Sequence, residues 1–249
     1  MISLKSKKVL SINKKISIIT VVKNDAVSLE KTLASILDLD DELYELIIID
    51  GKSTDETINV LRKYKNLITK LVSEPDSGIY NAMNKGIVFS TCNYLMFLNA
   101  GDTLYSAENL KEALKNSNST GIFFYSVNIE VTNNKYFIKH PPKNINWQVL
   151  YFKMPVCHQS IIYSLDAFRK YGCFDEQFKI AADYEWILRY FFAGEKIYTK
   201  NLVLSNYAIP GYSLINKDKL LIEKLKIVNK YFPLSILNYF VFNWLKRVQ

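Results

Sequence analysis

ISIITVV, at Ile16–Val22, is the stretch that decides the fold class of this 249-residue chain. Apolar and β-branched residues follow one another there without polar alternation, which is typical of a strand buried on both faces. A second run of this kind, LIIID at Leu46–Asp50, follows one helix-length segment later. Strands of this type predict a mostly parallel sheet with helices on both faces, an α/β fold.

Each expected strand is followed by a segment with helical features. We expect a helix from Ser28, whose hydroxyl is a candidate N-cap, and a capping box at residues 53–56, STDE, before the next helix. Further strands are expected around residues 71–72 and at residues 94–98. Apolar residues recur at helical spacing at Leu29, Leu33, Ile36, Leu37, Ile58, Leu61, Tyr64, Ile79, Met83 and Ile87.

The second half of the sequence predicts a smaller mixed sheet beside the first. GIFFYSVNIEV and KYFIK read as strands joined by a hairpin at Asn133–Asn134. A helix is expected from Asp183 to Phe192, and Gly194 suits its left-handed C-terminal cap. The chain becomes helical and basic after Ser213.

These patterns favour one α/β domain over residues 1–214 and a basic, apolar helical tail over residues 215–249. Within the domain we separate a first half, 14–105, from a second half, 106–214. Apolar residues at 49% and charged residues at 22% fit an ordinary globular protein. The cysteines, Cys92, Cys157 and Cys173, are odd in number and widely spaced, so we expect reduced packing residues rather than disulfides.

The formal charge of +8 favours an acidic partner, and nucleic acid, anionic lipid and phosphorylated substrates all have the required charge. Lysines alternate with large apolar residues from Lys217 to Arg247, which favours a membrane surface. Packing of the tail on the domain or on another subunit is an equal alternative. The N-terminal residues contain neither a signal-peptide core nor a span, so we expect a cytoplasmic protein, peripheral on the inner face of the cell membrane if the tail docks there.

Two acidic positions follow buried strands, where ligands of open α/β sheets bind. Asp50 ends a strand and is placed to accept hydrogen bonds from a nucleobase or ribose, although a turn aspartate would look the same. Asp102 closes the turn Asn99–Ala100–Gly101–Asp102, where a divalent ion would bridge its carboxylate and two phosphate oxygens. An ordinary Gly-Asp turn is the alternative there.

Three further places carry candidate chemistry. Asp76 and Lys85 flank a helix start whose free N–H groups suit an anion, or else they are a cap and a solvated lysine. Asp183 opens a helix and is either an N-cap or a general base for an acceptor hydroxyl. His158 is one of two histidines in the chain, and taken alone it suggests a satisfied, half-buried side chain.

The order of these segments carries more information than any one of them. ISIITVVKN, IIIDGKSTDET, SEPDSGIYNAMNKGI, YLMFLNAGD, PVCHQS and AADYEWILR together resemble glycosyltransferase family 2, and within it the bacterial polysaccharide-type members, over about residues 15–213. The resemblance implies a GT-A fold, inverting transfer, a Mn²⁺ or Mg²⁺ ion and a nucleotide-sugar donor, most often a UDP-sugar. It also implies a glycan or lipid-linked acceptor in capsule, O-antigen or exopolysaccharide synthesis, and no nucleic-acid partner.

The same resemblance implies roles for single residues. Asp102 takes the place of the metal-binding aspartate and Asp183 that of the catalytic base. Asp50 would contact the nucleobase. The remaining positions of the expected donor site are Thr20, Val22, Asn24, Asp76, Asn84, Lys85, Asn99, Ala100 and Gly101, and His158 and Gln159 are assigned to the acceptor or sugar pocket.

The chain also departs from the family pattern. Asn99 and Gly101 stand where the metal motif usually has further acids, so we expect weak metal binding that depends on the donor's diphosphate. Ala182 replaces the acid often found before the catalytic base. A non-catalytic nucleotide-sugar or carbohydrate-binding module of the same fold is therefore an open alternative, whereas a dinucleotide enzyme is disfavoured because no GxGxxG follows the first strand.

Overall fold

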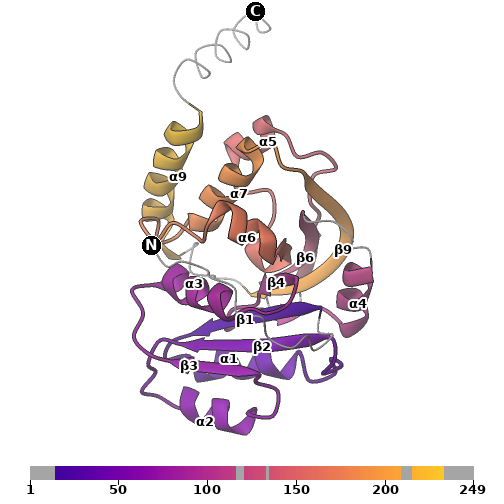
Figure 1. Cartoon of the computed structure of the whole chain (residues 1–249), viewed down its shortest axis with the longest axis vertical. Coiled ribbons are helices and arrows are strands. Elements are labelled where there is room, and N and C mark those ends of the chain that lie inside the picture. The colour runs from indigo at the N-terminus through magenta and orange to yellow at the C-terminus, as the bar shows by residue number, and fades with distance from the viewer. Residues whose placement is uncertain (1–14, 116–120, 133–134, 209–214, 233–249) are drawn as a thin grey trace, which may run out of the picture.

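The strands that the structure describes join into one curled, nine-stranded sheet with helices on both faces (Figure 1). The structure is a computed structural model that describes residues 15–115, 121–132, 135–208 and 215–232. The strands are β1 Ile16–Val22, β2 Tyr44–Asp50, β3 Lys70–Ser73, β4 Tyr94–Phe97, β5 Thr103–Leu104, β6 Ile122–Thr132, β7 Lys135–Lys139, β8 Ile161–Ser164 and β9 Ile197–Ala208. The helices are α1 Ala26–Ala34, α2 Thr57–Lys63, α3 Ile79–Phe89, α4 Ala107–Lys115, α5 Trp147–Phe152, the 3₁₀ turn η1 His158–Ser160, α6 Leu165–Tyr171, α7 Ala182–Phe192 and α9 Lys217–Tyr231.

The first half is the predicted parallel sheet. Its strands run in the order β3, β2, β1, β4, and every pairing among them is parallel. Ile19 of β1 lies opposite Ile47 of β2 on one side and Phe97 of β4 on the other. Every residue of β1 is buried, because helices cover it from both faces.

The second half is mixed, as predicted, and it continues the same sheet. β8 pairs antiparallel with both β4 and β6, so it joins the two parts. β6 runs parallel to β9 and forms a hairpin with β7. Asn133 and Asn134, the predicted hairpin turn, lie outside the described residues. The GT-A type of α/β fold expected from the sequence is confirmed by the structural comparisons given below.

Two apolar cores flank the sheet. One lies on the α1, α2 and α4 side, and the other lies under α3, α5, α6, α7 and α9. Trp186 of α7 is the largest fully buried side chain and packs against Phe168 and Tyr190. Because α7 is buried on most of its circumference, its first turn has a fixed position relative to the sheet.

Several local predictions about helix ends are wrong. Asp25, not Ser28, caps α1: its Oδ1 accepts the N–H of Ser28 at 3.2 Å. The helix also ends at Ala34, so Leu37 does not continue its stripe and is 52% exposed. A capping side chain needs only one acceptor, and the acid three residues earlier supplies it.

The predicted capping box at residues 53–56 is not formed either. α2 starts at Thr57, whose N–H donates to Asp55, and Glu56 makes no side-chain cap. Ser53 instead accepts the N–H of Asn24 at 2.8 Å, from the loop after β1. The hydroxyl of Ser53 therefore binds the backbone of a distant loop, although the local pattern predicted that it would cap α2.

The remaining helix ends agree with expectation. Gly194 follows α7 at a φ of +84°, the left-handed conformation that favours glycine at such ends. α9 gives the predicted helical, basic segment, and the tail beyond Phe232 lies outside the described residues.

The cysteines form no disulfide within the part of the chain that the structure describes. None of the described helices combines the length and the hydropathy that a membrane span requires.

Close packing of α3 on β1 yields the first test. A Cβ at Gly86 would lie 2.4 Å from Cγ2 of the buried Ile19. Gly86→Ala gains about 1 kcal/mol of helix propensity but overpacks this contact, so we expect a net loss of roughly 1–2 kcal/mol of unfolding free energy. Urea denaturation measures it, with Val88→Ala on the exposed side of the same helix as control. A stabilised Gly86→Ala variant would contradict this packing.

Candidate active site

The polar side chains of the first half gather where the parallel strands end. Asp50 is the last residue of β2, and the turn from Asn99 to Asp102 follows β4. β1 lies between these two strands, so both positions share one edge of the sheet (Figure 1). This is the edge at which open α/β sheets bind ligands.

At the β2 end, Asp50 is held by its own loop. Its carboxylate is fully buried and accepts the N–H of Ser53 at 3.1 Å and the hydroxyl of Ser73 at 2.5 Å. Asp76 lies directly against this loop: a Cβ on Gly51 would be 2.3 Å from its Oδ2. The structure thus brings Asp76 against Gly51, the residue that follows Asp50, and a side chain at Gly51 would obstruct the approach.

At the β4 end, Thr32 of α1 organises the turn. Its hydroxyl lies 2.7 Å from the carbonyl of Asp102 and accepts the N–H of Gly101 at 3.0 Å. Gly101 has a φ of +100°, where a side chain would be strained. The N–H of Ala100 donates to Val21 of β1 at 3.3 Å. Helix and strand therefore fix the turn from two sides.

Asp102 is buried, and its carboxylate meets the second half of the chain. Gln159 of η1 donates its amide to Asp102 Oδ1 at 3.0 Å. Burial raises the pKa of Asp102 from 3.8 to about 8, although the hydrogen bond from Gln159 opposes the shift. In the protein without bound ligands, this carboxyl group is therefore largely protonated at neutral pH.

A second contact between the β4 turn and η1 lies beside the one between Asp102 and Gln159. Asn99 Nδ2 lies 3.0 Å from His158 Nε2. Since the amide nitrogen can only donate, this contact assigns the proton of a neutral His158 to Nδ1. Burial lowers the pKa of His158, while the carboxylate of Asp183 acts in the opposite direction. Asp183 is thus close enough to influence His158 electrostatically.

Two buried oxygens of this group have no partner. Asn99 Oδ1 and Gln159 Oε1 accept no hydrogen bond from any residue that the structure describes. Together with the carboxylate of Asp102 they offer the hard oxygen donors that Mg²⁺ and Mn²⁺ prefer. Within the described ranges, no three His, Cys, Asp or Glu side chains cluster as a metal site. The donor set fits an ion that takes its remaining ligands from phosphate oxygens.

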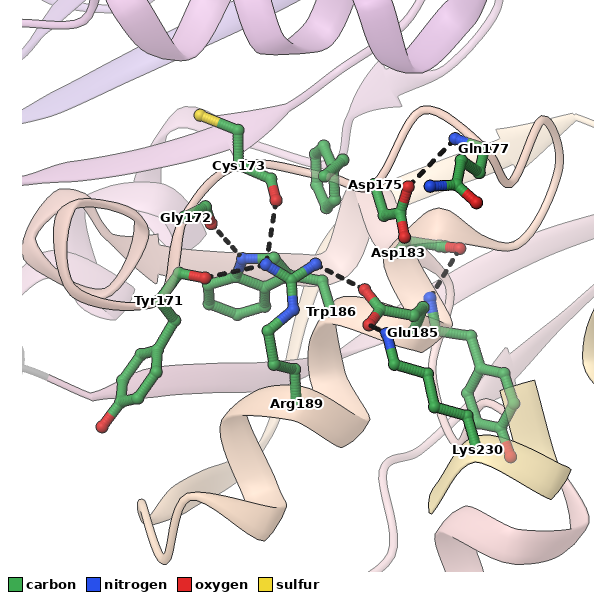
Figure 2. A network of polar contacts seen from close by, with 12 residues as sticks. Tyr171, Gly172, Cys173, Asp175, Gln177, Asp183, Glu185, Trp186, Arg189 and Lys230 are labelled. Atoms are coloured by element: carbon green, nitrogen blue, oxygen red, sulfur yellow. Dashed lines mark hydrogen bonds and ion pairs between the residues drawn. The ribbon is translucent and has the colours of Figure 1, made fainter. Parts of the chain in front are cut away.

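Asp183 lies in the first turn of α7 (Figure 2). Its Oδ1 accepts the N–H of Tyr184 at 2.8 Å and faces the hydroxyl of Tyr80 at 2.9 Å. Burial, and then the charge of Asp183, holds the pKa of Tyr80 well above its ordinary value, so the hydroxyl remains a donor. Asp183 itself is only partly buried, and the hydrogen bonds to Tyr80 and Tyr184 both use its Oδ1.

Other predicted donor-site residues have structural partners. Thr20 donates its hydroxyl to Leu98 at 2.7 Å, and Val22 packs into the core beside α1. Asn24, at a φ of +51°, accepts the N–H of Thr54 at 2.8 Å. These contacts hold the loop edge together, and the roles of these residues toward a ligand stay predictions.

The two predicted donor-site residues of α3 also have partners. Asn84 exchanges hydrogen bonds with the backbone of Phe174, and its amide also donates to Glu176 at 3.0 Å. Lys85 pairs with Glu74 at 2.7 Å and donates to Pro75 at 2.9 Å. A phosphate would therefore have to compete for Lys85 with its own loop.

Sequence reasoning missed Thr32, Gly51 and Tyr80. Thr32 sits inside an ordinary helix and carries no local pattern that marks it. Gly51 follows Asp50 directly, and a glycine beside a predicted ligand-binding strand end is a usable indication of close backbone approach. Tyr80 belongs to the SEPDSGIYNAMNKGI segment, but only the docking of α7 shows which residue its hydroxyl meets.

The sheet, its polar edge and the acid on α7 define an α/β protein of the GT-A type. Residues 17–176 match the family described as Glycosyl transferase family 2, and the chain belongs to that family. A PGL/p-HBAD biosynthesis glycosyltransferase of Mycobacterium tuberculosis (strain ATCC 25177 / H37Ra) is 30% identical over 154 residues, 59% of this chain and 58% of the relative. The chain therefore matches little more than half the length of that relative.

A second relative shares a shorter segment. The poly(ribitol-phosphate) beta-N-acetylglucosaminyltransferase TarP of Staphylococcus aureus (strain N315) is 36% identical over 113 residues, 43% of this chain and 35% of TarP.

Two solved structures share the fold. S. aureus TarS residues 1–349 in complex with UDP-GlcNAc superposes with a TM-score of 0.67 at 15% identity, covering 88% of this chain and 66% of TarS. The mannosyltransferase PcManGT from Pyrobaculum calidifontis, in complex with GDP-Man and Mn²⁺, gives 0.62 at 19% identity, covering 82% and 59%. At these identities the likeness establishes the fold.

The buried Asp102 makes a pH-dependent prediction for metal-free protein. Its folded pKa of about 8 exceeds the ordinary 3.8, so its contribution to stability is full at low pH and is lost as pH rises towards 8. Between pH 6 and pH 8 the wild type should lose roughly 2–3 kcal/mol more unfolding free energy than Asp102→Asn. Urea denaturation with a chelator present measures this, with the exposed Asp166→Asn as control. Parallel pH curves for wild type and Asp102→Asn would contradict it.

Proposed function

We propose that this chain is an inverting glycosyltransferase that moves a sugar from a nucleotide diphosphate donor, most simply a UDP-sugar, to a hydroxyl group. The acceptor is a glycan or a lipid-linked intermediate of bacterial surface polysaccharide synthesis. In this proposal residues 14–105 bind the donor and residues 106–214 bind the acceptor. Membership of Glycosyl transferase family 2 supports the reaction class.

One observation carries the proposal: the segment from Cys157 to Gln159 contacts one candidate functional acid, Asp102, and is within electrostatic range of the other, Asp183. Gln159 hydrogen-bonds Asp102 at the sheet edge. Cys157 is half-buried. Burial raises the pKa of its thiol, the charge of Lys139 lowers it, and Asp102 and Asp183, where ionised, raise it. A donor diphosphate at Asp102 and an acceptor hydroxyl at Asp183 would therefore meet across this segment.

On the donor side, Asp102 would hold a Mn²⁺ or Mg²⁺ ion, with Asn99 and Gln159 offering neutral oxygens. Such an ion offsets negative charge on the leaving diphosphate. Asp50, Gly51 and Asp76 form the adjoining edge that would receive the nucleoside. Binding of the nucleotide sugar would add phosphate oxygens to a donor set that contains a single carboxylate.

On the acceptor side, Asp183 would act as general base. Tyr80 and the backbone of Tyr184 occupy one carboxylate oxygen, so the other is directed to the acceptor. As the acceptor oxygen bonds to the anomeric carbon, its proton passes to Asp183 and the bond from that carbon to the diphosphate oxygen breaks. A single displacement of this kind inverts the anomeric centre.

Two solved structures of similar proteins support the donor class. TarS is described in complex with UDP-GlcNAc, and PcManGT in complex with GDP-Man and Mn²⁺. The two complexes contain different nucleotides and different sugars. They therefore support a nucleotide-sugar donor more strongly than any particular sugar. Our preference for uridine rests on the resemblance of the sequence motifs.

The base role of Asp183 is tested by Asp183→Asn. The amide cannot accept the acceptor's proton, so we expect transfer to fall by about 10²–10⁴-fold while donor binding remains. Product formation is measured with a panel of nucleotide sugars, and donor binding by thermal shift with Mn²⁺. Asp166→Asn, an exposed acid on α6, is the matched control. Undiminished turnover would remove Asp183 from this role, and a wild type that never releases nucleotide would favour the non-catalytic module.

We also propose that α9 docks the protein on an anionic membrane. Leu221, Ile222 and Leu225 are more than half exposed on its outer face. Lysines on the same helix flank this apolar strip: Lys217, Lys219, Lys224 and Lys226. Apolar residues between cations are typical of helices that lie in a membrane interface. Such docking would place the enzyme beside a lipid-linked acceptor.

Vesicle binding tests this surface. Replacing Leu221 and Leu225 together by serine should weaken binding to vesicles with phosphatidylserine by about tenfold or more, since each buried leucine contributes roughly 1–2 kcal/mol. Binding should also weaken with salt, because lysines contribute through screened charge. Val27→Ser, an equally exposed apolar residue on α1, is the control. Unchanged vesicle binding, or loss of a dimer in the double variant, would overturn the proposal.

A further inference from the structure

Helix α9 has an inner face that packs on α7. Ile227 and Phe232 are buried in the core on this side of the sheet, and Leu220 and Val228 are packed against it. Figure 1 shows α9 standing beside α7, on the side away from the strands. The family match ends at residue 176, so both helices lie beyond it. The inner face is separate from the outer strip of apolar and lysine residues.

One residue of this inner face holds the backbone just before α7. Glu223 accepts the N–H groups of Lys179, Ile180 and Ala181, at 2.7, 2.9 and 2.9 Å. Ala181 is the N-cap residue of α7 and has no side-chain acceptor to offer. Buried or half-buried N–H groups need an acceptor, and here a carboxylate from another helix supplies it for all three.

The segment fixed by Glu223 leads directly to Asp183. On its other side, the hydroxyl of Tyr80 lies 2.9 Å from the carbonyl of Ile180 and 2.9 Å from Asp183 Oδ1. Residues 180–183 are therefore held by polar contacts with α3 on one side and with α9 on the other. A shift of the backbone at Ala181 would be transmitted within half a helical turn to the carboxylate of Asp183.

A second contact anchors the far end of α9. Glu185 of α7 is fully buried and accepts hydrogen bonds from Arg189 at 2.5 Å and Lys230 at 2.8 Å (Figure 2). The hydroxyl of Tyr231 donates to the same carboxylate at 2.6 Å. Burial would raise the pKa of Glu185, but the hydrogen bonds from these partners hold it below its ordinary value. The carboxylate is thus ionised, and separating α9 from α7 would leave a buried charge with fewer partners. This contact keeps Glu223 in register with the start of α7.

We propose that α9 is a working part of the active site, in which Glu223 is a positioning residue that sets the place of Asp183 through the backbone of residues 179–181. The inference rests on the proposed function, because it concerns the base of that reaction. In this proposal, Glu223 contacts neither the donor nor the acceptor. Its loss therefore alters turnover without altering donor binding.

The test compares Glu223→Gln and Glu223→Asp in the full chain with Asp218→Asn, a neighbouring exposed acid on α9. Glutamine has one acceptor oxygen for three N–H groups, so we expect kcat to fall about tenfold or more with the donor KM unchanged. Aspartate keeps the carboxylate and should recover part of the loss, while Asp218→Asn should match wild type. Thermal melting verifies that each variant is folded.

Amide hydrogen exchange gives a readout that does not depend on turnover. Ile180 and Ala181 should be protected in the wild type and exchange at least tenfold faster in Glu223→Gln, while the centre of α7 is unaffected. Wild-type kcat and protection in folded Glu223→Gln would overturn the inference and leave the proposed function standing. An equal loss of donor affinity and kcat would also overturn it, as would unfolding of Glu223→Gln accompanied by unfolding of Glu223→Asp. If the wild type transfers no sugar while the exchange result holds, the proposed function fails and the anchoring by Glu223 stands.

Discussion

Burial of β1 on both faces is the constraint on which the rest of the structure depends. α1 covers one side of this strand and α3 the other, so every residue of the strand is buried. Polar groups in such a sheet must lie where the strands end, and parallel strands end at the same edge. Asp50 and Asp102 therefore meet one surface although they are far apart in sequence. The close approach of α3 at Gly86 also decides where Tyr80 lies.

The turn after β4 shows how this sheet edge is coupled to the second half. Thr32 fixes the turn from α1, and Gln159 reaches Asp102 from η1. The cost of burying the Asp102 carboxylate makes the site poor for a bare negative charge. A divalent cation would remove that cost, and a diphosphate would complete its coordination. In our proposal, metal alone binds weakly and metal with donor binds more tightly.

In our proposals, helix α9 has two roles, one on each of its faces. Its outer face has the apolar and cationic character of a membrane-binding helix, while its inner face holds the start of α7. The buried Glu185 ties the two helices together with Lys230 and Tyr231. In our proposals, the segment that brings the protein to its acceptor also orders the base that activates that acceptor.

By itself the sequence determined the parallel strands, the helices that follow them and the strand-end positions of Asp50 and Asp102, because these depend on local apolar patterns and chain direction. Local patterns erred where a tertiary partner competed: Ser53 bonds Asn24 instead of capping α2. Only the tertiary structure decided which partners meet across the fold. Gln159 with Asp102, Tyr80 with Asp183 and Glu223 with Ala181 are separated by 57, 103 and 42 residues. Such contacts depend on how helices dock on the sheet, and no periodicity in the sequence encodes that docking.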